Sequence, residues 1–163
     1  MTYYIRANSQ RQFTIERLGA ELYSVLFSDW MKQQATAQLH DSEYTFDKPS
    51  WWSSDRTIYK NNVPIGSMSF GWSGHLTLNL TTDENTDLAY VLKSRGVFRP
   101  RIELVENGSN RLLLIMYAES NWFKYNYRIE ELNAGAIHYP ISELLGILSV
   151  GAAMIQERQN SYV

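Results

Sequence analysis

The sequence of 163 residues contains no cysteine. This absence excludes disulfide bonds, thiol catalysis and cysteine-ligated metal sites, and it fits a reducing compartment. The chain also lacks an excess of basic charge, because 15 lysines and arginines are set against 17 acidic residues. Nucleic-acid binding needs a basic footprint, so we do not expect a nucleic-acid partner.

Signals for export and membrane insertion are missing as well. The amino terminus has neither the basic segment nor the apolar run of a signal peptide, and we therefore expect a cytoplasmic protein, with a peripheral membrane location as an alternative. The apolar stretch at residues 141–155 contains two glycines. It is shorter than the about 20 residues that cross a bilayer, so we do not expect an integral membrane protein.

Catalytic motifs are also lacking. The sequence has no Gly-x-Ser-x-Gly element, and the glycine-containing run at residues 66–71 is not followed by the Lys-Ser/Thr of a phosphate-binding loop. The three histidines are scattered along the chain: His40, His75 and His138. We predict a non-enzymatic protein without cofactor or metal. An enzyme that uses His40, Asp41 or Glu43 remains an alternative hypothesis.

Short strands are what the chain does contain. Before Pro140, apolar residues recur with period two, and turn residues interrupt them about every 8–12 positions, which is typical of barrels and sandwiches. We predict about twelve strands, at residues 2–6, 12–17, 20–27, 31–39, 42–46, 56–60, 63–70, 75–81, 88–93, 97–105, 111–118 and 123–130. The fourth of these segments has the weakest pattern and is also compatible with a helix.

Two local patterns refine the strand prediction. Asn61-Asn62 lies between two short strands and predicts a tight hairpin. Pro64 and Gly66 weaken the second strand of that hairpin, so we expect either a sheet edge or a bulge there. Leu76, Leu78 and Leu80 alternate with polar residues and are expected to face the core.

One helix is predicted, over residues 140–157. Pro140 suits the first helical turn, where its missing N–H leaves no donor unsatisfied, and Glu143 suits the positive end of the helix dipole. The apolar residues that follow lie on every side of the helix rather than on one stripe. A helix of this kind is buried on all sides.

The two features together predict the fold. We expect residues 1–163 to form a single, mainly β domain: a closed antiparallel barrel of about twelve strands that encloses the C-terminal hydrophobic helix. A barrel of this size has an interior too wide for its own side chains to fill, and the helix would fill it. The alternative is a lipocalin-like carrier with the helix outside and a small apolar ligand in an open lumen.

The order of elements resembles the tubby C-terminal-like superfamily, which includes the LURP-one-related proteins and the phospholipid scramblases. The matching stretches are the Tyr59-Lys-Asn-Asn-Val-Pro-Ile-Gly66 hairpin, the hairpin at residues 115–129 and the helix at residues 141–155. The resemblance implies a twelve-stranded barrel with the last helix through its centre. It also implies a binding role, since tubby proteins bind phosphoinositides through basic residues on the barrel and scramblases are associated with membranes.

Two groups of residues are candidates for a binding surface. Lys93, Arg95, Arg99 and Arg101 form the densest basic cluster. Arginine matches the oxygen geometry of phosphate, so this cluster predicts an anion site; a charged edge strand is the structural alternative.

Aromatic residues provide the second group. Trp51 and Trp52 suggest an aromatic loop contact, although a loop packed over the end of the barrel explains them equally well. We expect Trp30, Trp72 and Trp122 at the barrel ends or in the core. The sequence thus predicts a binding or scaffold module whose exterior contacts an anionic phospholipid or a protein partner. It does not define the oligomeric state.

Overall fold

Every strand in this computed structural model pairs with two neighbours, and all the pairs are antiparallel. The structure describes residues 2–9, 12–17, 19–29, 34–39, 41–50, 53–96, 100–119 and 126–160. Its strands are β1 (Thr2–Ser9), β2 (Gln12–Arg17), β3 (Ala20–Asp29), β4 (Gln34–Leu39), β5 (Ser42–Asp47), β6 (Arg56–Lys60), β7 (Val63–Phe70), β8 (Leu76–Thr81), β9 (Asp87–Arg95), β10 (Arg101–Glu106), β11 (Leu112–Ala118) and β12 (Tyr127–Glu131).

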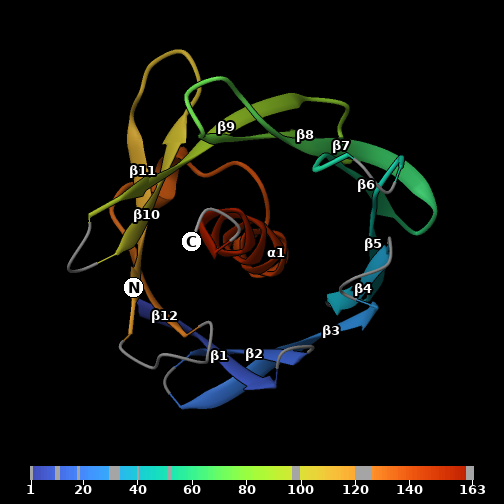
Figure 1. Cartoon of the computed structure of the whole chain (residues 1–163), viewed down its shortest axis with the longest axis horizontal. Helices are drawn as coiled ribbons and strands as arrows, with labels where there is room; N and C mark the ends of the chain where they lie inside the picture. The colour runs from blue at the N-terminus through green and yellow to red at the C-terminus, as the bar shows by residue number, and fades with distance from the viewer. Residues whose placement is uncertain are drawn as a thin grey trace.

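The first and last strands lie side by side. β1 pairs with β2 on one side and with β12 on the other, so the strand order β1-β12-β11-β10-β9-β8-β7-β6-β5-β4-β3-β2 returns to its start as a closed barrel. A short 3-10 helix, η1 (Ala134–Ala136), leads from β12 into the helix α1 (Ile141–Asn160). Figure 1 shows the ring of strands with α1 inside it. The predicted mainly β class, with twelve strands and one C-terminal helix, is confirmed.

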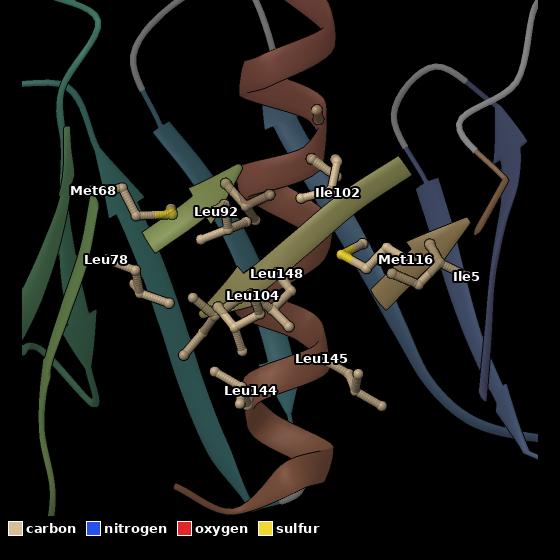
Figure 2. Packing of buried hydrophobic residues seen from close by; sticks show 14 of the residues in the cluster. Ile5, Met68, Leu78, Leu92, Ile102, Leu104, Met116, Leu144, Leu145 and Leu148 are labelled. Atoms are coloured by element: carbon tan, nitrogen blue, oxygen red, sulfur yellow. The ribbon is translucent and has the colours of Figure 1, made fainter. Parts of the chain in front are cut away.

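Alternation along the strands directs one set of side chains inward. Leu76, Leu78 and Leu80 are at most 1% exposed, as predicted, while the residues between them are partly or fully exposed. Leu144, Leu145 and Leu148 of α1 face strand residues from several sides of the ring, among them Ile5, Met68, Leu78, Leu92, Ile102, Leu104 and Met116 (Figure 2). The helix and the barrel wall therefore share one core.

The helix is buried along most of its length, as its all-round apolar sequence predicted. Every residue at positions 143–155 is buried. Glu143 and Ser149 are the polar residues of this buried stretch, and the Ser149 hydroxyl donates a hydrogen bond of 2.6 Å to the carbonyl of Gly146 within the helix. The helix continues three residues beyond the predicted end at residue 157, where Gln159 Nε2 donates to Ser94 Oγ at 2.8 Å.

The helix does not run at equal distance from all strands. It approaches β2, β3 and β4 most closely, and the inward residues of β4 include the small Ala35 and Ala37. Larger side chains from β7, β8 and β9 cover its other side, such as Met68, Leu76 and Leu92. The side chains of the barrel wall and of α1 thus pack into one hydrophobic core.

The predicted hairpin at Asn61-Asn62 is present. Both asparagines adopt positive φ, at 50° and 66°, as the two-residue turn of a tight hairpin requires. The register between β6 and β7 shifts between Ile58 and Tyr59, so the expected irregularity is a bulge and not a sheet edge. At Gly66, a Cβ atom would overlap the backbone carbonyl of Asn79, which explains why β7 has glycine at this position.

One strand begins later than predicted. β10 starts at Arg101, whereas the sequence predicted a strand at residues 97–105 that crosses Pro100. Proline has no N–H to contribute to a sheet, and its carbonyl instead accepts a hydrogen bond of 3.0 Å from the backbone N–H of Ala118. Residues 97–99 of the predicted strand lie outside the described residues.

Candidate functional site

The basic cluster predicted from the sequence lies on the outer wall of the barrel, where β9 and β10 pair. Arg95 lies opposite Arg101 in the register, and Lys93 lies opposite Glu103. Leu92 and Ile102, which alternate with them, are buried in the core. Because successive strand residues point to opposite faces, the charged side chains point outward.

Two arginines of this cluster pair with a single carboxylate, and Lys93 lies opposite the same residue in the strand register. Arg95 Nε lies 3.2 Å from Glu103 Oε1, and Arg101 Nε lies 3.6 Å from Glu103 Oε2. The Glu103 side chain is 15% exposed, whereas those of Arg95 and Arg101 are 48% and 44% exposed. Lys93, Arg95 and Arg101 therefore carry two positive charges more than Glu103 offsets, and both guanidinium groups are accessible. We call these four residues with His75 the wall cluster.

His75 belongs to this cluster although the sequence did not group it with the basic residues. Burial lowers the pKa of His75, and the positive charges of Lys93 and Arg95 lower it further. Strand pairing explains the position of His75. Leu76 pairs with Leu92 in the antiparallel register, so His75, one residue before Leu76, is brought close to Lys93, one residue after Leu92.

The other predicted site residues have different outcomes. Arg99, Trp51, Trp52 and His40 lie outside the described residues. Asp41 and Glu43 are exposed at the turn between β4 and β5, where the backbone N–H of Glu43 donates to Asn61 Oδ1 at 2.9 Å. Neither acid lines the pocket described next. The structure thus brings together Lys93, Arg95 and Arg101 of the predicted residues.

A pocket of about 350 Å³ opens at the end of the barrel where α1 begins. It is formed by the end of β6, the loop between β8 and β9, and the segment that enters the helix. Its lining residues are Lys60, Thr82, Asp83, Glu84, Ile137, His138, Tyr139 and Pro140. Of these residues, the sequence suggested only His138 as a candidate for chemistry, because the lining comes from three separate parts of the chain.

Behind this pocket lies a buried polar network centred on Glu143 in the first turn of α1. The hydroxyl of Tyr44 donates to Glu143 Oε1 at 3.0 Å and shares a hydrogen bond of 2.8 Å with the hydroxyl of Tyr139. Lys60 Nζ lies 3.4 Å from Glu143 Oε1 and 3.3 Å from Asp83 Oδ2. The network connects the start of the helix to β5, β6 and the β8–β9 loop.

Each group in this network has another member as its partner. Burial acts to lower the pKa of Lys60, but Glu143 and Asp83 outweigh it and raise the pKa above its ordinary value. Burial raises the pKa of Tyr44 far above the usual range, and the hydrogen bond from Tyr139 adds to this effect. Lys60 is therefore an ammonium and Tyr44 a neutral phenol at neutral pH. We interpret the network as an anchor for α1 rather than as a reactive centre.

Among the residues that the structure describes, no three His, Asp or Glu side chains gather as a metal site would require. Within the same residues, no helix combines the length and the apolar character needed to cross a membrane.

The barrel interior is occupied by α1, so a ligand would bind on the outer wall or at the barrel ends. No family model matches the sequence, and comparisons with curated proteins and with solved structures give no significant match.

Proposed function

We propose that the protein is a non-enzymatic binding module that holds an anionic ligand at the wall cluster. One observation carries this proposal: Arg95 and Arg101 share the single carboxylate of Glu103 on an exposed wall, and Lys93 lies opposite Glu103 in the strand register. Two guanidinium groups on neighbouring strands offer paired donors that match phosphate or carboxylate oxygens. The ligand class is therefore an anion with several oxygens, on a lipid headgroup or on a protein partner.

The filled interior supports an exterior site. The lipocalin-like alternative needs an open lumen for its ligand, and α1 occupies that space with residues 143–155 all buried. An enzyme built on Asp41 and Glu43 would need them in a cleft, and both are exposed outside the described pocket. Both observations favour a binding module over these alternatives.

The relationship to the tubby C-terminal-like superfamily is part of the same proposal. Twelve strands followed by a buried C-terminal helix is the order of elements that the resemblance implies. The wall cluster would then be this chain's own version of a basic binding surface. This assignment is an interpretation of the arrangement of elements, and the binding experiment below does not depend on it.

Vesicle pelleting tests the proposed function. The wild-type protein should pellet with vesicles that contain phosphatidylserine more than with phosphatidylcholine alone. The double variant Arg95→Ala/Arg101→Ala should bind roughly 30-fold more weakly, since each basic residue near an anionic surface contributes about 1 kcal/mol.

The matched control removes two arginines that lie outside the wall cluster and that each have a close carboxylate partner. Arg6 lies 3.0 Å from Glu16 and Arg111 lies 2.8 Å from Glu106, so Arg6→Ala/Arg111→Ala should retain most of the binding. An acidic protein or peptide in place of vesicles tests the second ligand source with the same variants. Equal binding of both double variants to every anion would disprove the assignment to the wall cluster.

A further inference from the structure

Trp72 is the most exposed large apolar side chain among the described residues. It is fully exposed, at 108%, whereas Val63, Leu132 and Leu22 reach 59%, 47% and 38%. Full exposure of the large apolar tryptophan side chain to water is unfavourable. A fully exposed tryptophan therefore commonly marks a site of contact with another surface. The sequence predicted Trp72 at a barrel end or in the core; it is at a barrel end, where its side chain is fully exposed.

The tip of the hairpin between β7 and β8 holds Trp72 outward. The backbone N–H of Gly71 donates to the carbonyl of His75 at 2.9 Å, and that of Gly74 donates to the carbonyl of Gly71 at 3.1 Å. Gly74 adopts a φ of +81°, which only glycine reaches without strain. Hydrogen bonds therefore close the turn directly around Trp72.

The same end of the barrel carries the wall cluster. β7 ends at Phe70, β8 begins at Leu76, β9 ends at Arg95 and β10 begins at Arg101, so the antiparallel register places these four strand ends together. His75 follows the Trp72 tip directly and lies within the electrostatic influence of Lys93 and Arg95. One exposed tryptophan and an excess of positive charge thus occupy adjoining parts of one barrel end.

A further cation lies at this end. The guanidinium of Arg158, in the last turn of α1, lies 4.4 Å from the centre of the Phe70 ring. Phe70 is the last residue of β7 and lies two positions before Trp72. The end of the central helix therefore adds positive charge beside the strand that leads into the Trp72 tip.

This combination fits the surface of an anionic bilayer. Tryptophan favours the interfacial layer, where its ring is partly in hydrocarbon and its N–H remains hydrated. Basic residues alone give weak recruitment, and stable attachment needs a second contribution from apolar burial. A free anion or a headgroup in solution would use the arginines but would leave Trp72 unused.

We propose that this barrel end docks on anionic membranes, with Trp72 in the interfacial layer and Lys93, Arg95 and Arg101 against the headgroups. The inference rests on the proposed anion-binding function and specifies a bilayer as the source of the anion. It makes Trp72 the residue that distinguishes a membrane from an anion in solution.

The experiment compares two kinds of anion. Binding of the wild-type protein and of Trp72→Ala is measured with phosphatidylserine-containing vesicles and with inositol hexakisphosphate in solution. We expect Trp72→Ala to weaken vesicle binding about tenfold or more, since that corresponds to burying one large apolar side chain, and to leave binding of the polyanion unchanged. Because Trp72 is exposed, the variant should keep the wild-type melting temperature.

Fluorescence provides a second measurement. Lipids brominated near the headgroup should quench the tryptophan fluorescence of the wild-type protein. The Trp72→Phe variant retains the other four tryptophans, so the part of this quenching that comes from Trp72 should be lost in it. Val63→Ala and Leu132→Ala serve as controls, because these exposed residues lie at the opposite end of the barrel. Neither control should change vesicle binding.

The outcomes separate the two proposals. If the wild-type protein binds neither vesicles, nor the polyanion, nor an acidic protein, the proposed function fails and this inference fails with it. If vesicle binding depends on Arg95 and Arg101 but is unchanged in Trp72→Ala, and Trp72 is not quenched, the proposed function stands and the membrane-docking inference is wrong. If the wild-type protein binds an acidic protein but not vesicles, the proposed function also stands and the membrane-docking inference is wrong.

Discussion

Glu143 joins the central helix to the barrel wall. Its side chain is 8% exposed, and its carboxylate accepts a hydrogen bond from Tyr44 and pairs with Lys60. It also lies in the first turn of α1, where negative charge is favourable. A buried charge is stable only when it is paired and hydrogen-bonded, so these contacts explain how a carboxylate can lie at the edge of an apolar interior.

Replacing Glu143 with glutamine should lower the free energy of unfolding by about 1.5–3 kcal/mol, because the substitution removes charge from a hydrogen bond and an ion pair. Urea denaturation followed by tryptophan fluorescence measures the change. Glu84→Gln is the control, since Glu84 is an exposed acid on the same pocket, and its effect should stay within about 0.5 kcal/mol. Equal effects of the two substitutions would contradict the anchoring role.

The Glu143→Gln variant should also change how stability depends on pH. The folded state holds the pKa of Lys60 above its ordinary value, so this stabilisation is complete below about pH 10 and is lost as the pH rises through the folded-state pKa. In Glu143→Gln the loss of stability at alkaline pH should be smaller than in the wild-type protein.

His75 should make the protein less stable in acid. Burial, together with Lys93 and Arg95, lowers its pKa in the folded state, so the unfolded chain binds this proton more readily. Stability therefore falls as the pH decreases below about 6.5. Urea unfolding between about pH 5 and 8 should show a smaller slope for His75→Gln.

At the scale of elements, α1 depends on glycine where it passes close to the wall. A Cβ atom at Gly146 would lie 2.6 Å from both terminal methyl carbons of Leu39 in β4. At Gly151 the nearest atoms, on Leu76 and Leu92, would lie at 3.2 Å. Glycine normally costs a helix about 1 kcal/mol relative to alanine, so its presence at Gly146 reflects space and not helix propensity.

A double-mutant cycle tests this contact. Gly146→Ala alone should destabilise the protein by about 1–3 kcal/mol through overpacking, and Leu39→Ala alone by about 2–5 kcal/mol through a cavity. The double variant should be at least about 1 kcal/mol more stable than the sum of the two single destabilisations predicts, since the new methyl group at position 146 occupies the space that Leu39 leaves.

Gly135→Ala is the control for the cycle, because a Cβ atom there meets nothing within 4 Å. It should couple with neither substitution. Additive effects of Gly146→Ala and Leu39→Ala would show that the two residues do not share one space.

The elements also show where pattern reading succeeds and fails. β2, β6 and β7 begin and end at the predicted residues, and the Asn61-Asn62 turn sets the boundary between the last two. β9 begins one residue earlier and ends two residues later than predicted, because its last residues pair with β10 although they lack an apolar pattern. Such boundaries depend on the partner strand, which a local pattern does not contain.

At the scale of the whole molecule, α1 and the strands form a single cooperative unit. Leu144, Leu148 and Ala152 of the helix are at most 1% exposed and belong to the same core as the strands. The helix therefore has no separate core of its own. Removing it from the barrel would expose the interior faces of the strands at the same time.

Hydrogen exchange should reveal this cooperativity. The amides of residues 144–155 should exchange only through global unfolding, with the same free energy as the amides of β8, because both are buried in one core. Native-state exchange read by mass spectrometry measures the two segments together. Faster exchange of the helix at low denaturant would mean that α1 leaves the barrel while the strands stay paired, which would contradict this view.

The wall cluster was predictable in part. Lys93, Arg95 and Arg101 are close together along the chain, so the sequence identified them as a basic cluster. The contacts of Arg95 and Arg101 with Glu103, and the position of His75 beside Lys93, depend on strand register. The position of Trp72 at the same barrel end depends on which strand ends coincide. The pocket lining and the Glu143 network come from segments far apart in the sequence, and no local pattern links them.

Sequence alone determined the mainly β class, the number of strands and the need to bury the final helix, because alternation, turn residues and all-round apolarity are local properties. Tertiary structure decided which residues meet: Glu143 with Tyr44 and Lys60, and the Trp72 tip with the wall cluster. The physical reason is that pairing of β1 with β12, and the path of α1 through the ring, set distances between residues that the chain itself separates by tens of positions.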